Sequence, residues 1–281
     1  MSAAITLDDV VARLQDLPSL PAVVMELLTA IDQDDADISV LAKKVSHDQA
    51  LTAKTLRLAN SSAYGLQVKV TTIQQALTFL GFQTTRNLIT AAAVTGCFAQ
   101  GQCAGFNDKA FWRHSIAVAA CARVLARRMR FNQDYAFTAG LLHDIGRLVL
   151  VSTYPEQYAA AIALRAAKDC EMLDAERAVL GVDHVAAGVA LAEHWNFSDT
   201  MKQAIAQHHD PEAPGAGFLA TIIHVANAIV HALDLAGEED DLVPPVSAVA
   251  WNALGLNEEA YLHVFRETEL QFEEISAALM A

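Results

Sequence analysis

The stretch Phe137-Thr-Ala-Gly-Leu-Leu-His143-Asp144-Ile-Gly-Arg147-Leu-Val-Leu150 places a histidine and an aspartate side by side in an apolar run. Imidazole and carboxylate groups lose hydration when they are buried, so an apolar helix that carries both needs a compensating interaction. Six of the ten histidines lie between residues 114 and 209, which puts this pair in the histidine-rich part of the chain. The stretch therefore indicates either a working metal site or the remains of one.

The composition favours a helical protein with a full core. Hydrophobic residues make up 53% of the 281 residues, while Gly (13) and Pro (7) are few. Such a chain can bury enough apolar surface to fold. Alanine is frequent and aromatic residues are only 7%, a mixture that favours helices over strands. We therefore expect an all-α fold.

The charge and the apolar pattern exclude several classes of protein. The formal net charge of -14 disfavours extended binding to nucleic acid, because the chain repels a polyanion. The longest apolar run, 218–235, contains two histidines, an asparagine and an aspartate, which suits a buried helix better than a membrane span. We expect no membrane association.

The cysteines and the N-terminus predict a cytoplasmic location. Cys97, Cys103, Cys121 and Cys170 form no CxxC pair, so neither a zinc ribbon nor a redox motif is indicated, and we expect reduced thiols. The N-terminal segment lacks a basic stretch followed by an apolar one, so we expect no secretory signal.

Helical periodicity and stop signals divide the chain into three parts. We expect an N-terminal helical region over 1–105, a helical bundle over 106–236, and an acidic loop with C-terminal helices over 237–281. The boundary near 99–108 contains two glycines and no periodicity. The predicted helices span 7–16, 21–32, 38–46, 49–60, 73–80, 83–98, 108–130, 134–152, 155–169, 172–180, 184–195, 199–208, 218–235, 247–254 and 257–279.

The helix over 134–152 carries the opening pair, and Asn132 or Asp134 is its expected cap; Asp108 is the expected cap of the preceding helix. Neighbouring residues on one helix point about 100° apart. His143 and Asp144 could therefore reach one ion only if it lay over the groove between them. Gly146, which follows, is expected to permit close helix packing.

Several polar side chains on separate predicted helices could converge on such an ion. Side chains from different helices of a bundle can meet at one point. Imidazole and carboxylate together suit iron, manganese, zinc or nickel. A metal of this kind could activate water and stabilise charge on a phosphoryl oxygen. The candidates are His114, His143, Asp144, His184, His194, His208, His209, His224 and Asn227.

The region around 111–235 resembles the HD superfamily of metal-dependent phosphohydrolases. The motifs that carry this resemblance are FWRHS at 111–115, HDIGR at 143–147, DHVAAGVALAEHW at 183–195 and AIAQHHDPE at 204–212. More closely, residues 10–235 are similar to the HDOD domain, a bacterial-type signalling relative. That match rests on LPSLP at 17–21, SHDQALTAKTLRLANSSAYG at 46–65 and IQQALTFLGFQTTRNLI at 73–89. It implies an N-terminal helical region packed on an HD-like bundle.

The resemblance implies a set of metal ligands: His114, His143, Asp144, His184, His208, His209 and Asn227. Asn227 stands where the superfamily has an aspartate, and an amide oxygen is a weaker, uncharged ligand. Arg147 stands where catalytic relatives usually have lysine, and the Gly-Tyr-Pro sequence of the cyclic-di-GMP hydrolases is missing after His209.

These features imply a non-catalytic signal-transduction module with a residual metal site, which binds a signalling protein partner or a small phosphate-containing ligand. The alternative is a metal-dependent phosphohydrolase acting on a nucleotide or another phosphate ester, with Asp144 and Arg147 in catalytic roles. His114 and His143 could instead be core histidines, and His208 and His209 helix-end cations. Structural roles are expected for His194, His224, His231 and His263.

Overall fold

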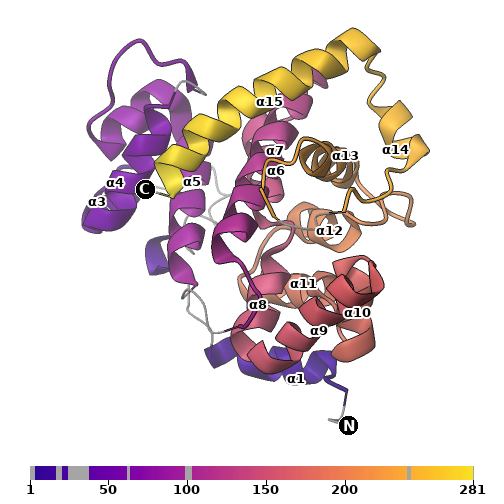
Figure 1. Cartoon of the computed structure of the whole chain (residues 1–281). Coiled ribbons are helices and arrows are strands. Elements are labelled where there is room, and N and C mark those ends of the chain that lie inside the picture. The colour runs from indigo at the N-terminus through magenta and orange to yellow at the C-terminus, as the bar shows by residue number, and fades with distance from the viewer. Residues whose placement is uncertain are drawn as a thin grey trace.

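The computed structural model describes residues 4–16, 21–24, 38–61, 64–98, 103–238 and 242–280 (Figure 1). Within these ranges every regular element is a helix, so the all-α prediction is confirmed. The helices are α1 (Leu7–Arg13), η1 (Leu14–Asp16), α3 (Ile38–Ser46), α4 (Gln49–Ala59), α5 (Ile73–Cys97), α6 (Asp108–Arg128), α7 (Gln133–Leu142), α8 (Ile145–Thr153), α9 (Pro155–Lys168), α10 (Met172–Val179), α11 (His184–His194), α12 (Asp199–Gln207), α13 (Phe218–Ala232), α14 (Ala248–Ala253) and α15 (Glu258–Leu279).

Short polar side chains start most of these helices, as the sequence predicts. Asp183 accepts a hydrogen bond from the Ala186 N–H and so caps α11, and Ser198 and Asn132 cap α12 and α7 in the same way. The expected cap of α6 was wrong by one residue, because Asn107 rather than Asp108 accepts from the Ala110 N–H. Local capping chemistry thus fixes where the elements that carry the histidines begin.

Helix α6 is the centre of the molecule. Its side chains are buried almost without interruption from Ala110 to Ala126, and it packs against α7, α13 and α15. Figure 1 shows α15 crossing the bundle, with its C-terminal end beside α4 and α5. At the opposite end, α1 packs on α8 and α11, and the Ile5 N–H donates to the Leu180 carbonyl over 2.7 Å. The division at residues 105/106 stays a prediction.

The predicted continuous helix over 134–152 is wrong, because the structure has two helices there. Helix α7 ends at Leu142 and α8 begins at Ile145. The chain leaves the helical path at Asp144, which has φ −100° and ψ 12°. With this turn, the Nε2 atom of His143 lies 3.6 Å from the Oδ1 atom of Asp144. The predicted break at Gly81 is confirmed, since its φ of 81° kinks α5.

Some expectations fall outside the described residues. Of the predicted helix over 21–32 only 22–24 are described and helical, and the side chain of Cys97 is also outside. The other three cysteines are free thiols, of which Cys103 and Cys121 are buried. Among the described helices, none combines the length and the apolar character that crossing a membrane requires.

Gly146 lets α8 and α11 approach closely, as predicted. A Cβ atom added there would lie 1.9 Å from the His184 carbonyl oxygen and 2.5 Å from the Gly188 backbone nitrogen. Both neighbours are backbone atoms, so no side-chain rotation could relieve the overlap. The glycine therefore sets the distance between Asp144 at the start of α8 and His184 at the start of α11.

We expect Gly146→Ala to lower the free energy of unfolding by about 1–3 kcal/mol, since overpacking outweighs the gain in helix propensity. Urea unfolding measures this change. Ser152→Ala, at an exposed position on the same helix, is the matched control and should change stability by less than about 0.5 kcal/mol. Equal stability of Gly146→Ala and wild type would contradict the close approach of α8 and α11.

Candidate metal centre

The structure brings the predicted ligands together from five parts of the bundle. His114 lies on α6, His143 and Asp144 at the α7–α8 turn, His184 at the start of α11, His208 and His209 just after α12, and Asn227 on α13. All are buried except His209, which is partly exposed. Residues separated by more than a hundred positions in sequence thus converge on one point of the core.

Two groups of ligand atoms share Asp144. One atom from each of Asp144, His184, His208 and His209 lies within 4.8 Å of the others, and the same holds for His114, His143 and Asp144. The Asp144 Oδ1 atom lies 3.6 Å from the Nε2 atom of His143 and 3.4 Å and 3.3 Å from those of His184 and His208. This carboxylate is the geometric centre of the site.

Three of the histidines are oriented alike: each has its Nδ1 atom hydrogen-bonded to the protein and its Nε2 atom facing Asp144. The Nδ1 atom of His143 is 2.7 Å from the Gly140 carbonyl oxygen, and that of His208 is 2.8 Å from the Ile205 carbonyl oxygen. In His184 the Nδ1 atom is 2.6 Å from Glu176 Oε2. Carbonyl and carboxylate oxygens only accept, so Nδ1 carries the hydrogen and the neutral ring keeps its lone pair on Nε2.

Several of the inward atoms have no hydrogen-bond partner within the protein. They are Nε2 of His143, Nε2 of His208 and Oδ1 of Asn227, and all three are buried. A buried polar atom without a partner costs about 1–3 kcal/mol. Lone pairs of this kind around one carboxylate are what a cation would satisfy, so these residues fit a divalent transition metal.

The protonation of the site also suits a metal. Burial lowers the pKa of His143 to about 4, and burial likewise lowers the pKa values of His114 and His209. Burial acts to raise the pKa of Asp144, but nearby His143 and His184 outweigh it and hold that pKa well below its usual value. His184 is the exception: burial acts to lower its pKa, but Glu176 and Asp144 outweigh it and raise that pKa. Neutral imidazole and ionised carboxylate are the forms that bind metals, so metal binding at His184 would displace the proton that its raised pKa favours.

Arg147 lies at the edge of the same site and is already engaged. Its Nη1 atom is 3.5 Å from Asp144 Oδ2, and its Nε–H donates to the Tyr158 hydroxyl over 3.1 Å. The guanidinium carbon lies 5.9 Å from the ring centres of both Phe106 and Phe111. The side chain is thus fixed by three kinds of contact.

The structure also settles the surroundings of other histidines. In His224 both ring nitrogens are used: Nδ1 donates to the His208 carbonyl over 2.8 Å, and Nε2 accepts from the Ser247 N–H over 2.9 Å. The expected structural role of His224 fits this arrangement. His194 and His263 are exposed. None of these three rings belongs to the described clusters of ligand atoms.

Sequence reasoning missed three residues around the site. Glu176 and Tyr158 are fully buried and hydrogen-bonded to each other. His231, expected to be structural, lines the pocket, and its ring centre is 4.6 Å from that of His114. Its position four residues after Asn227 places both on one face of α13, and that spacing could have indicated it. Glu176 gave no comparable signal.

The open space beside the ligands is small. The pocket lined by Asp144, Asn227 and His209 has a volume of about 70 Å³. Residues of the loop after α13, including Glu238, Leu242 and Pro244, form part of its wall. A second cavity of about 290 Å³ adjoins it and also contacts His209 and Asn227.

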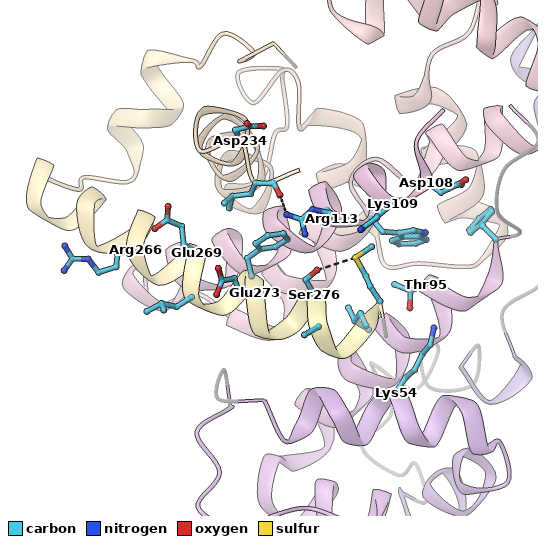
Figure 2. A pocket seen from close by; sticks show the side chains of 18 residues that line it. Lys54, Thr95, Asp108, Lys109, Arg113, Asp234, Arg266, Glu269, Glu273 and Ser276 are labelled. Carbon is cyan, nitrogen blue, oxygen red and sulfur yellow. Dashed lines mark hydrogen bonds between the residues drawn. The ribbon is translucent and has the colours of Figure 1, made fainter. Parts of the chain in front are cut away.

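A much larger cavity, of about 1530 Å³, lies elsewhere in the described structure (Figure 2). Figure 2 shows it between α15, the start of α6 and Lys54 of α4; Arg113 reaches across to the Leu235 carbonyl oxygen at 2.9 Å. None of the predicted metal ligands lines it. Judged by volume alone, this groove would be the first candidate for a binding site. The side chains that can bind a metal, however, line the small pocket.

Two solved structures share this arrangement of helices. An HDOD domain protein of unknown function from Geobacter sulfurreducens superposes with a TM-score of 0.79 over 98% of both chains, at 24% identity, a likeness that shows the fold. A candidate phosphohydrolase from Shewanella amazonensis SB2B superposes with a TM-score of 0.76 and 30% identity, over 96% of this chain and 97% of that one.

Sequence comparison gives the same family. An uncharacterized protein of Treponema pallidum (strain Nichols) is 28% identical over 205 residues, which are 72% of this chain. This chain spans only 39% of the length of that relative. The model of the HDOD domain matches residues 17–211, which include the α7–α8 turn and all the predicted ligands except Asn227. The chain therefore belongs to the HDOD domain family.

Proposed function

We propose that this chain is a regulatory HDOD module that binds a divalent transition metal and acts through a signalling protein partner or a small phosphate-containing ligand, without turnover. The metal would be held by Asp144 and the histidines around it, with Asn227 as a weak additional ligand. Iron, manganese, zinc and nickel all suit imidazole and carboxylate donors. When bound, such a metal supplies a fixed positive charge and Lewis acidity.

The observation that carries the regulatory role is the size of the space beside the ligands. Ligand pockets usually measure about 300–1,000 Å³. The pocket at Asp144 has about 70 Å³, and its lining combines the carboxylates of Glu171 and Glu238 with the guanidinium groups of Arg147 and Arg165. A substrate ester together with its leaving group would have to reach Asp144 through this narrow space, so the volume at the ligands opposes turnover.

The state of two further residues supports the same proposal. Asn227 offers an uncharged oxygen where the superfamily has a carboxylate, which lowers the expected affinity for a metal. Arg147 is tied to Tyr158 and Asp144, so it would have to give up contacts within the protein to reach a phosphate. Arginine also cannot lose its proton to act as a general base.

The alternative is a metal-dependent phosphohydrolase acting on a nucleotide or another phosphate ester. Favouring it are the near-complete set of converging ligands and the likeness to the candidate phosphohydrolase of Shewanella. In that case Asp144 and Arg147 would contact the reacting groups. The adjoining cavity of about 290 Å³ could take the rest of the substrate.

The metal site can be tested by elemental analysis. We expect the wild-type protein to carry about one or more transition-metal ions per chain, and Asp144→Ala to carry none, because this carboxylate is common to both groups of ligands. The exposed Asp199→Asn is a control that removes the same charge elsewhere. A wild-type metal content below about 0.1 ion per chain after incubation with manganese, iron or zinc would contradict the proposal.

A second variant tests the weak ligand. Asn227→Asp restores a carboxylate at a buried position where the amide oxygen has no partner. We expect it to tighten manganese binding by about tenfold or more, equivalent to roughly 1.4 kcal/mol, measured by calorimetry. An unchanged or weaker affinity would show that residue 227 does not face the ion.

Turnover separates the two proposed functions. The regulatory proposal predicts that the manganese-loaded protein hydrolyses none of a panel of nucleotides and phosphate diesters above the rate of Asp144→Ala. Release of inorganic phosphate and of mononucleotides is the measurement. Hydrolysis that depends on both manganese and Asp144 would overturn the regulatory proposal in favour of the phosphohydrolase.

A further inference from the structure

The fully buried carboxylate of Glu176, on α10, lies near the pocket of the candidate ligands but does not line it. A buried ionised carboxylate is costly unless several donors compensate it. Three donors do so here, and two of them belong to one residue, His184.

Glu176 holds His184 at two atoms at once. Its Oε2 atom accepts from the His184 backbone N–H over 2.7 Å and from the ring at Nδ1 over 2.6 Å. His184 is the first residue of α11, where backbone N–H groups have no partner within the helix. The two bonds fix both the start of the helix and the orientation of the ring.

The opposite edge of the same ring faces the candidate ligands. The Nε2 atom of His184 lies 3.4 Å from Asp144 Oδ1 and 3.0 Å from Nε2 of His209. With the hydrogen held on Nδ1 by Glu176, the ring in its neutral form directs its lone pair to this point. A carboxylate that accepts from the far side of a metal-binding imidazole also makes the ring a stronger donor.

The geometry points to Glu176 as a positioning residue: it fixes the tautomer and orientation of His184 for metal binding. This inference rests on the proposed metal centre and adds to it a residue from an element, α10, that supplies no ligand. Glu176 does not line the ligand space, so its direct link to the candidate ligands is the pair of bonds to His184.

The same carboxylate also reaches Arg147 through a tyrosine. The Tyr158 hydroxyl donates to Glu176 Oε1 over 2.9 Å and accepts from the Arg147 Nε–H over 3.1 Å. Burial raises the pKa of Tyr158 well above its usual value, so the hydroxyl keeps its hydrogen. Tyr158 is thus a useful comparison, because its loss removes the link to Arg147 and leaves both bonds to His184.

The test compares Glu176→Gln, Tyr158→Phe and Asp174→Asn, with cobalt(II) alone as the probe in calorimetric titrations. We expect Glu176→Gln to raise the cobalt Kd by about 10–100-fold, because the ring loses its charged acceptor. Tyr158→Phe should keep the wild-type Kd. Asp174→Asn, an exposed carboxylate on the same helix, is the matched control and should also keep it.

A merely structural role predicts a different pattern. Glu176→Gln would then lower the melting temperature of the metal-free protein and leave the cobalt Kd unchanged, and this result overturns the inference. If wild-type protein binds no cobalt, the proposed metal centre itself fails, and the role of Glu176 fails with it. Tight binding by wild type and by Glu176→Gln alike would refute only the positioning role.

A measurement on the wild-type protein covers the case in which Glu176→Gln does not fold. In the cobalt-loaded protein, the Nδ1–H proton of a coordinated histidine gives a paramagnetically shifted NMR signal. We expect the His184 proton to exchange slowly with solvent, because its acceptor is fully buried. Exchange as fast as that of an exposed imidazole would show that Glu176 does not hold this hydrogen.

Discussion

The structure depends on the burial of one carboxylate, Asp144, among imidazole rings. Its Oδ1 atom is within 3.6 Å of three Nε2 atoms that come from different parts of the bundle. Burying an ionised carboxylate costs several kcal/mol of hydration free energy unless nearby charges or hydrogen-bond donors compensate it. In the metal-free protein His184, whose pKa the carboxylates of Glu176 and Asp144 raise against the effect of burial, compensates it in part, and a cation shared by the ligands would take over that role. The arrangement therefore supports the proposed metal centre.

Backbone packing sets this geometry as much as the ligands do. The turn at Asp144 redirects the chain, and the absence of a side chain at Gly146 lets α8 meet α11 at backbone distance. His184 begins α11 at this crossing, and Glu176 fixes its ring from behind. Small shifts in helix packing would therefore move ligand atoms directly. This links the stability of the bundle to the ability of the site to bind a metal.

Most of the helices, and the set of candidate ligands, could be predicted from the sequence because both have local signals. Caps such as Asp183 and Ser198 can be recognised by residue type, because their short side chains accept hydrogen bonds from the first turn of the helix. The histidines can be recognised because they lie in apolar segments. The break after His143 could not be predicted, because neither residue 143 nor residue 144 is a glycine or a proline. The direction of α8 is set instead by the tertiary packing of Gly146 against α11. Glu176 was missed for a related reason: its burial depends on Tyr158 and His184, which only the fold brings near.

The same features explain why a site rich in ligands need not be an enzyme. Catalysis requires room for the substrate and charged groups available to it, whereas metal binding requires only converging donors. Here the donors converge, but Arg147 is held by Tyr158 and Asp144, and the space directly beside Asp144 is about 70 Å³. Because the ligands come from five parts of the bundle, a metal bound to the folded state alone would stabilise the whole arrangement. Under the proposed regulatory role, a bound metal would hold the surrounding surface in one conformation, and that surface rather than the pocket would contact the partner.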